Sequence, residues 1–137
     1  MIIPMLKGLL LTFNRFFSRP ITIQYPEEKM PAAPRWRGIQ YFERDEQGKT
    51  KCVACGLCMI VCPSQCIYIE TAEDDEGRRY PLRYELDASR CIYCGYCEEA
   101  CPVSAIFMGK TYEWVEGTRK PLLLDTDKLL EQKKLNP

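Results

Sequence analysis

The feature that most constrains this chain is a cysteine pattern that occurs twice. Residues 52–63 read CVACGLCMIVCP and residues 91–102 read CIYCGYCEEACP, so each stretch has the form C-x2-C-x2-C-x3-C-P. Three thiolates with this spacing allow one short loop to hold one face of a cubic iron-sulfur cluster. Because the pattern is complete in both stretches, the sequence predicts two 4Fe-4S clusters.

The two cysteine stretches belong to a longer internal repeat with a period of 39 residues. Outside the cysteines, Gly56 matches Gly95 and Ile67 matches Ile106. The same cysteine run is typical of bacterial two-cluster ferredoxins. The predicted fold class is therefore α+β, with a two-cluster ferredoxin-like core over residues 39–109 whose halves are related by a pseudo-twofold axis.

The ligands of the two clusters are expected to cross between the halves. In two-cluster ferredoxins the fourth cysteine of each run binds the other cluster. Pro63 and Pro102 favour extended backbone at the preceding cysteine, which turns the chain away from its own loop. The first cluster is assigned to Cys52, Cys55, Cys58 and Cys101, and the second to Cys91, Cys94, Cys97 and Cys62. Electron transfer between such clusters requires no acid, base or nucleophile, so no catalytic residue is expected.

The amino-acid composition argues against several other functions. The chain has 19 basic and 19 acidic residues, a balance that argues against nucleic-acid binding. It has no histidine, which excludes a Rieske centre and most zinc sites with histidine ligands. The cysteine spacing is that of metal ligation and not of a disulfide framework, which places the chain in a reducing compartment. A zinc-stabilised interaction module remains the alternative from a different class.

The residues near the ligands are assigned structural roles. Cys66, the ninth cysteine, aligns with Ala105 in the repeat, so it is predicted to be a small buried residue and not a ligand. Tyr93 and Tyr96 are predicted to pack on the clusters and not to relay electrons. An apolar shell that keeps water from the sulfurs is expected from Val53, Leu57, Ile60, Val61, Ile67, Ile92, Tyr93, Tyr96 and Ile106.

The N-terminal region, residues 1–38, is predicted to dock on partner subunits. Apolar side chains recur over residues 5–17 with the spacing of an amphipathic helix. No apolar run reaches the roughly 18 residues that a transmembrane helix needs, so the helix is expected on a membrane surface or against a membrane-embedded partner. The alternative is that it only covers the core. Residues 20–37, rich in proline, are predicted to form an extended arm.

The secondary structure of the rest of the chain is predicted from its hydrophobic periodicity and its turn residues. Strands are predicted over residues 39–43, 67–70, 80–86 and 106–108, with a solvent-exposed acidic turn at 73–77. Asp125 or Thr126 is expected to cap a short helix that runs to about Leu135. The faces of this helix are weakly patterned. We therefore expect the C-terminal extension, residues 110–137, to brace a partner subunit or to fray.

Taken together, these features resemble subunit I of respiratory complex I, the NADH:quinone oxidoreductase. The resemblance depends on the amphipathic helix, on TIQYPEEK from Thr22 to Lys29, on Arg37-Gly38 and on both cysteine runs. Many members have a histidine shortly after the Arg-Gly pair, and Gln40 stands near that place here. The departure concerns local tuning or an interface contact and not the cluster ligands.

The resemblance implies an electron-transfer subunit of a hetero-oligomeric enzyme. Electrons from NADH would cross the two clusters one at a time and pass to a terminal cluster and quinone in a neighbouring subunit, coupled in the whole complex to proton translocation. The partners would be other iron-sulfur subunits of the peripheral arm and the quinone-reducing subunit. The expected location is peripheral, on the cytoplasmic face of a bacterial inner membrane. The alternatives are the ferredoxin-like subunit of a membrane-bound hydrogenase-type complex and a free soluble ferredoxin.

Overall fold

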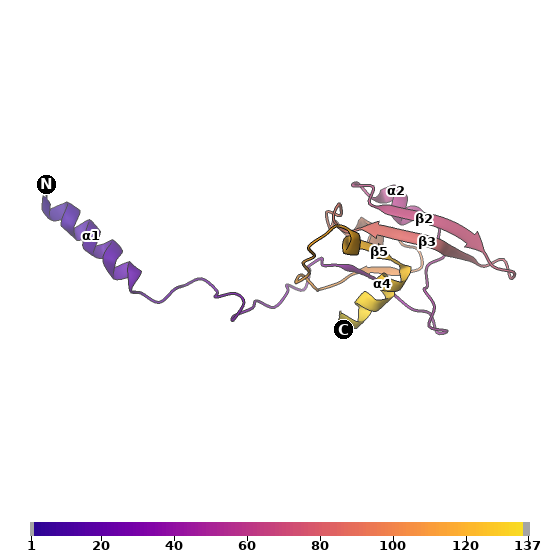
Figure 1. Ribbon diagram of the computed structural model, residues 1–137, viewed down its shortest axis with the longest axis horizontal. Coiled ribbons are helices and arrows are strands. Elements are labelled where there is room, and N and C mark those ends of the chain that lie inside the picture. Colours follow the sequence, from indigo (N-terminus) through magenta and orange to yellow (C-terminus); the bar gives the residue numbers. More distant parts are fainter. Residues whose placement is uncertain (1, 136–137) are drawn as a thin grey trace. The chain divides into compact units, whose positions relative to one another are not determined.

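The computed structural model of the chain describes residues 2–135. These residues form two compact units, one up to Pro31 and one from Ala32 onwards. The elements, coloured along the sequence in Figure 1, are α1 (Ile2–Phe16), β1 (Gln40–Phe42), α2 (Leu57–Val61), β2 (Ile67–Glu73), β3 (Arg79–Asp87), α3 (Tyr96–Glu99), β4 (Ile106–Met108), η1 (Lys120–Leu122), β5 (Leu123–Asp125), α4 (Thr126–Gln132) and η2 (Lys133–Leu135).

The first unit contains helix α1, which begins three residues earlier than the sequence pattern predicts. Pro4 lies in the first turn, where the missing N–H is not needed by the helix. The helix ends at Phe16, and just beyond it the Ser18 backbone N–H donates to the Arg15 carbonyl at 3.1 Å, two residues before Pro20. None of its residues is buried within the unit. No helix among residues 2–135 is both long enough and apolar enough to span a bilayer.

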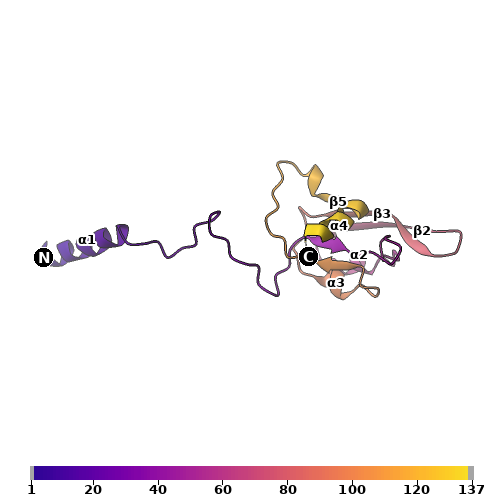
Figure 2. The same ribbon diagram turned by 90° about the horizontal axis from the view of Figure 1, so that it is seen from below.

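The second unit contains two antiparallel sheets. Strand β1 pairs with β4, with Gln40 opposite Met108. In the other sheet β3 lies between β2 and β5, with Leu86 opposite both Ile67 and Leu124. Both views show β5 alongside β3 (Figures 1 and 2). The sequence-predicted strands are therefore observed, with β2 three residues longer than expected at its C-terminal end.

The pairing of the strands explains the core. Alternate residues of β3 point inward, so Tyr84 and Leu86 are almost completely buried. Phe42 from β1 packs on Tyr84 with ring centroids 4.7 Å apart in an edge-to-face arrangement. Ile106 from β4 is also buried. The core thus joins strands from both halves of the repeat, and the cluster loops emerge from its edge.

The chain enters the second unit through a close backbone approach at Gly38. The Gly38 N–H donates to the Gly109 carbonyl at 2.7 Å. A Cβ atom at this position would lie 2.3 Å from the Thr111 carbonyl oxygen, so only glycine fits. Residues 32–38, which the sequence assigns to an extended arm, are therefore part of the second unit together with the core.

The described part of the C-terminal segment packs on the core, which differs from the expectation of a frayed end. Asp125 caps α4 by accepting a hydrogen bond from the Lys128 N–H at 2.8 Å. Leu129 and Leu130 are buried against the core, and an ion pair joins Lys133 to Glu43 beside β1. The compact unit therefore extends well beyond residue 109, and Figure 2 shows α4 next to β5.

Candidate iron-sulfur centres

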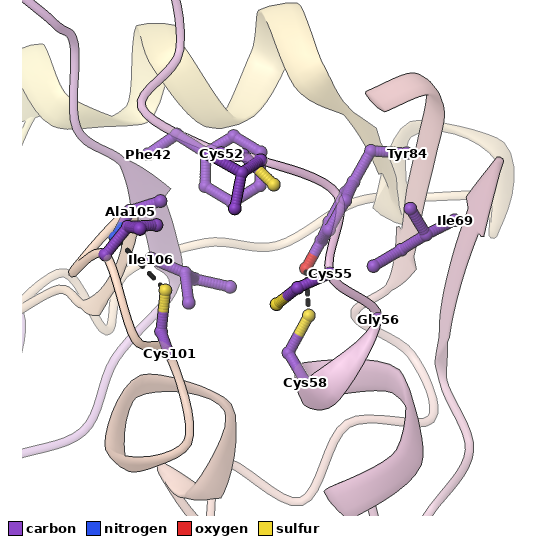
Figure 3. Close-up of a pocket in the computed structure, with 12 residues that line it drawn as sticks. Phe42, Cys52, Cys55, Gly56, Cys58, Ile69, Tyr84, Cys101, Ala105 and Ile106 are labelled. Carbon is purple, nitrogen blue, oxygen red and sulfur yellow. Dashed lines mark hydrogen bonds between the residues drawn. The ribbon is translucent and has the colours of Figure 1, made fainter. Parts of the chain in front are cut away.

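The first cysteine run supplies three thiols to a cavity that a fourth thiol, from the second run, completes. The thiols of Cys52, Cys55 and Cys58 line this cavity together with Cys101. Figure 3 shows their sulfur atoms directed toward a common space. Phe42, Tyr84, Ile69 and Ile106 form the apolar wall, and the space between the atoms is about 330 Å³, part of it open to solvent.

The second run supplies three thiols to a separate cavity of similar size. Cys91, Cys94 and Cys97 line it together with Cys62 from the first run, around about 300 Å³ of space that is also partly open. Gln40 and Cys66 lie in the same wall. The structure therefore gathers the eight predicted ligands into the two crossed groups of four that the sequence assigns.

The backbone of the two loops repeats in conformation as well as in sequence. Gly56 and Gly95 have φ angles of 78° and 84°, in the left-handed region that glycine adopts without strain, and each stands directly before a short helix, α2 or α3. Two further positions of each half have φ between 48° and 54° although they are not glycine. These are Ala54 and Gln65 in the first half, and Tyr93 and Ser104 in the second.

The left-handed residues turn backbone N–H groups toward the sulfurs. The Ala54 N–H donates to Cys52 Sγ at 3.4 Å, and the Tyr93 N–H donates to Cys91 Sγ at 3.3 Å. The Ala105 N–H donates to Cys101 Sγ at 3.2 Å. Hydrogen bonds of this kind stabilise negative charge on sulfur and are one of the factors that set cluster potentials.

Burial opposes ionisation of several ligands. It raises the pKa of the Cys52 thiol to about 11 and the pKa of the Cys97 thiol to about 12. The pKa of Cys91 is instead lowered to about 7, by hydrogen bonds from Cys66, from the Tyr93 N–H and from Gln40, against the effect of burial. Because metal ligands must be thiolates, binding iron at neutral pH releases protons from Cys52 and Cys97.

The two cavities fit 4Fe-4S clusters better than single metal ions. Four cysteine thiolates are the ligand set of such a cluster. Within the described range, 2–135, no three or more Cys, Asp or Glu side chains stand close enough together to hold one metal ion. The thiols instead surround a wider space, which is the arrangement that a cubic cluster needs.

The expected apolar shell is only partly present. Ile67 and Ile106 are buried beside the cavities. In contrast, Ile60 is 77% exposed and Ile92 is 63% exposed. Leu57, Val61 and Tyr96 are also exposed. Ile92 nevertheless lines the second cavity. The predicted shell is therefore confirmed only in part, since a large share of the surface of these five side chains is open to solvent.

The structure also identifies a contact that the sequence did not single out. The Tyr84 hydroxyl lies 3.8 Å from Cys58 Sγ inside the first cavity, and Tyr84 is 1% exposed. A tyrosine on a strand outside both cysteine runs carries no motif, so only the register of β3 brings it to the cluster. Burial raises the pKa of this hydroxyl well above its usual value, which keeps it protonated and able to donate.

Cys66 is buried, as predicted, but it lies closer to the ligands than the repeat suggests. Its Sγ is 3.4 Å from Cys62 Sγ, so five cysteines line the second cavity where a cluster needs four. We expect the Cys66→Ala variant to keep both clusters, because Ala105 occupies the equivalent place in the other half. Iron content and low-temperature EPR of the reduced protein check this, and loss of either cluster would show that Cys66 is a ligand.

Comparisons with known proteins agree with the iron-sulfur assignment. Residues 51–105 match the family described as the 4Fe-4S dicluster domain. A solved structure described as the membrane-bound sulfane sulfur reductase, an archaeal respiratory membrane complex, contains a similar chain with a TM-score of 0.55 and 27% identity. That match covers 80% of this chain and 55% of the other.

Curated relatives match over most of the chain. A Rhizobium meliloti protein named NADH-quinone oxidoreductase subunit I 2 is 50% identical over 90% of this chain, which spans 66% of that relative. A Geobacter metallireducens protein of the same name is 42% identical over 96% of this chain and 100% of its own length. A Geobacter sulfurreducens protein named NADH-quinone oxidoreductase subunit I 1 is 43% identical over 97% of this chain and 100% of its own length.

Proposed function

Because the chain belongs to the NADH-quinone oxidoreductase subunit I family, we propose that it relays single electrons through two 4Fe-4S clusters. When bound, each cluster supplies one-electron redox chemistry. The residues of this chain hold the clusters, donate hydrogen bonds to their ligands and cover them from one side. The proposed ligands are Cys52, Cys55, Cys58 and Cys101 for the first cluster, and Cys91, Cys94, Cys97 and Cys62 for the second.

The observation that carries the proposal is the crossing of the two cysteine groups. Helix α2 places Cys58 in the wall of the first cavity, and its C-cap residue, Cys62, lines the second. Four residues of α-helix rise by about 6 Å, so one helical turn separates ligands of the two sites. Tunnelling rates fall steeply with distance, and this closeness supports electron exchange between the clusters. The matching loop conformations support a pseudo-twofold relation between the halves.

The electrons are proposed to originate from NADH and to leave toward a terminal cluster and quinone in neighbouring subunits. The names of the relatives support this direction. Residues 1–38 are proposed to dock on partner subunits or on the cytoplasmic face of a bacterial inner membrane, in a complex that translocates protons. The wholly exposed apolar side of α1 supports such a partner.

Purification of the native assembly through a tag on this chain tests the proposal. We expect recovery of a large membrane complex with NADH:quinone activity and with reducible 4Fe-4S signals. Recovery of a soluble monomer would contradict it and favour a free ferredoxin. Recovery of a membrane complex that oxidises another donor would favour the second candidate, an equivalent subunit of a different respiratory membrane complex, which the similarity to the archaeal reductase supports.

Replacing two residues of the exposed apolar side of α1 is expected to release the chain from its complex. In Leu9→Asp/Phe13→Asp, both side chains are 59% or more exposed in the free chain. Each substitution removes about 1.5–3 kcal/mol of binding free energy, which comes from burial of the apolar side chain against the partner. Together they are expected to lower the affinity of the chain for its complex by at least about a hundredfold. The control is Asn14→Asp, on the polar side, which adds a negative charge to the same helix without removing apolar surface. The amount of this chain in washed membranes is the measurement, and equal retention of all three proteins would contradict docking through α1.

A further inference from the structure

The side chain of Gln40 contacts a ligand of the second cluster although it lies outside both cysteine runs. Gln40 is the first residue of β1 and is 1% exposed. Its Nε2 donates to Cys91 Sγ at 3.1 Å. Its Oε1 is buried and accepts no hydrogen bond from any residue that the structure describes. The carboxamide is therefore held in the cavity wall by its N–H end alone.

The backbone explains why Gln40 reaches this sulfur. Strand β1 pairs with β4, so Gln40 is fixed opposite Met108 and near the second cluster loop. Helix α4 also packs on β1, and an ion pair joins Lys133, at the end of the helix, to Glu43, next to the strand. A buried amide oxygen without a hydrogen bond lowers the stability of the folded state, because the oxygen has given up its hydrogen bonds to water and gained none in the protein. Among the residues that the structure describes, Cys91 is the hydrogen-bond partner of this side chain that offsets the loss.

The first cluster site has no amide side chain in the corresponding place. Its side-chain donor is the Tyr84 hydroxyl, which lies 3.8 Å from Cys58 Sγ, a longer contact than that of Gln40. The backbone donors to Cys52 and Cys91 are equivalent in the two halves. In the second site Ser64 Oγ and Cys66 Sγ also lie 3.5 Å and 3.4 Å from Cys62 Sγ. The first site also has the Ala105 N–H, which donates to Cys101 Sγ at 3.2 Å. The two sites therefore differ in this backbone donor and in their side-chain donors.

We propose that Gln40 is a positioning residue that raises the reduction potential of the second cluster and so separates it from that of the first. On reduction the cluster gains one electron, and its cysteine sulfurs become more negative. An N–H donor stabilises the reduced state more than the oxidised state, because hydrogen bonds to more strongly charged acceptors are stronger. Glutamine supplies this donor without carrying charge itself. The inference rests on the proposed cluster ligands.

The test is a redox titration of the tagged native complex carrying Gln40→Met, followed by low-temperature EPR of each cluster. Methionine keeps the length and removes the donor. We expect the equilibrium constant for reduction of the second cluster to fall about tenfold, which for a one-electron couple is a shift of about 59 mV to lower potential. The first cluster should keep its potential. An unchanged second cluster, or an equal shift of both clusters, would overturn the inference.

Matched variants separate this effect from a general disturbance. Tyr84→Phe removes the side-chain donor of the first site, and we expect it to lower only the potential of the first cluster. Gln40→His keeps a buried N–H donor and is expected to return the second cluster toward its original potential. If Gln40→Met loses the second cluster, the comparison of Gln40→His with Gln40→Leu decides. Gln40→Leu has no N–H donor in this side chain. An equal potential of the second cluster in these two variants would overturn the inference.

Iron analysis distinguishes failure of this inference from failure of the proposed function. A purified complex with no 4Fe-4S signals from this chain would refute the electron-relay function itself. A complex with both clusters present and no response of the second potential to Gln40→Met would refute only the role of Gln40. The potential is the decisive measurement here, because a role limited to packing would change stability without a selective shift.

Discussion

Replacing Cys62 by serine is expected to damage the cluster that Cys91, Cys94 and Cys97 hold, and to leave the other cluster intact. Cys62 is next to the first cysteine loop in sequence, but its side chain lines the second cavity. The reason is the extended backbone at Cys62, with φ −69° and ψ 113°, which ends α2 before Pro63 and turns the chain toward the other half. Removing one of four thiolates weakens or abolishes the cluster concerned.

The measurement is iron content together with EPR of the reduced protein. Loss of the second cluster would lower the iron content from about eight to about four atoms per chain, since each cluster contains four. The mirror variant, Cys101→Ser, should remove the signal of the first cluster instead, because Cys101 lines the first cavity. If Cys62→Ser damaged only the cluster of its own loop, the crossed assignment would be refuted.

Sequence alone predicts the centre of this protein well because the constraint is chemical. Iron coordination requires thiolates at fixed spacing. Because the pattern repeats after 39 residues, the role of a residue in one half predicts the role of its counterpart in the other. For example, the alignment of Ile67 with Ile106 predicts the starts of both β2 and β4, and both strands begin there. The alignment of Cys66 with Ala105 predicts a buried residue, and Cys66 is buried.

The parts that sequence missed depend on tertiary packing. Strand β5 has three residues and forms only because β3 offers it an edge, with Leu124 opposite Leu86. The sequence predicts helix α4 itself but not its packing, because the seven residues of the helix show no clear apolar stripe. Leu129 and Leu130 are nevertheless buried against the core. The contacts of Gln40 and Tyr84 with sulfur follow from strand register and not from any local pattern. Such contacts carry no periodicity that a single sequence could reveal.

Removal of iron is expected to unfold the second unit. Four of its residues other than glycine have left-handed backbone in the cluster loops. Each such residue costs about 1–2 kcal/mol, and together they cost of the order of 4–8 kcal/mol. The net stability of a domain is only about 5–15 kcal/mol. Loss of iron removes the bonds that hold these loops. It also leaves one empty cavity beside Phe42 and Ile106 and a second beside Ile67 and Leu86. We therefore expect the second unit to lose most of its free energy of unfolding.

Hydrogen exchange of the purified chain before and after anaerobic chelation measures this effect. We expect the backbone amides of β2 and β3 to lose protection by roughly a thousandfold, which corresponds to about 4 kcal/mol. Helix α1 is an internal control, because it has no buried residue and belongs to the other unit, so its exchange should not change. Addition of iron and sulfide should restore the protection. Unchanged exchange in β2 and β3 after complete loss of iron would instead mean that the core of Tyr84, Leu86 and Leu129 holds the unit together without the clusters.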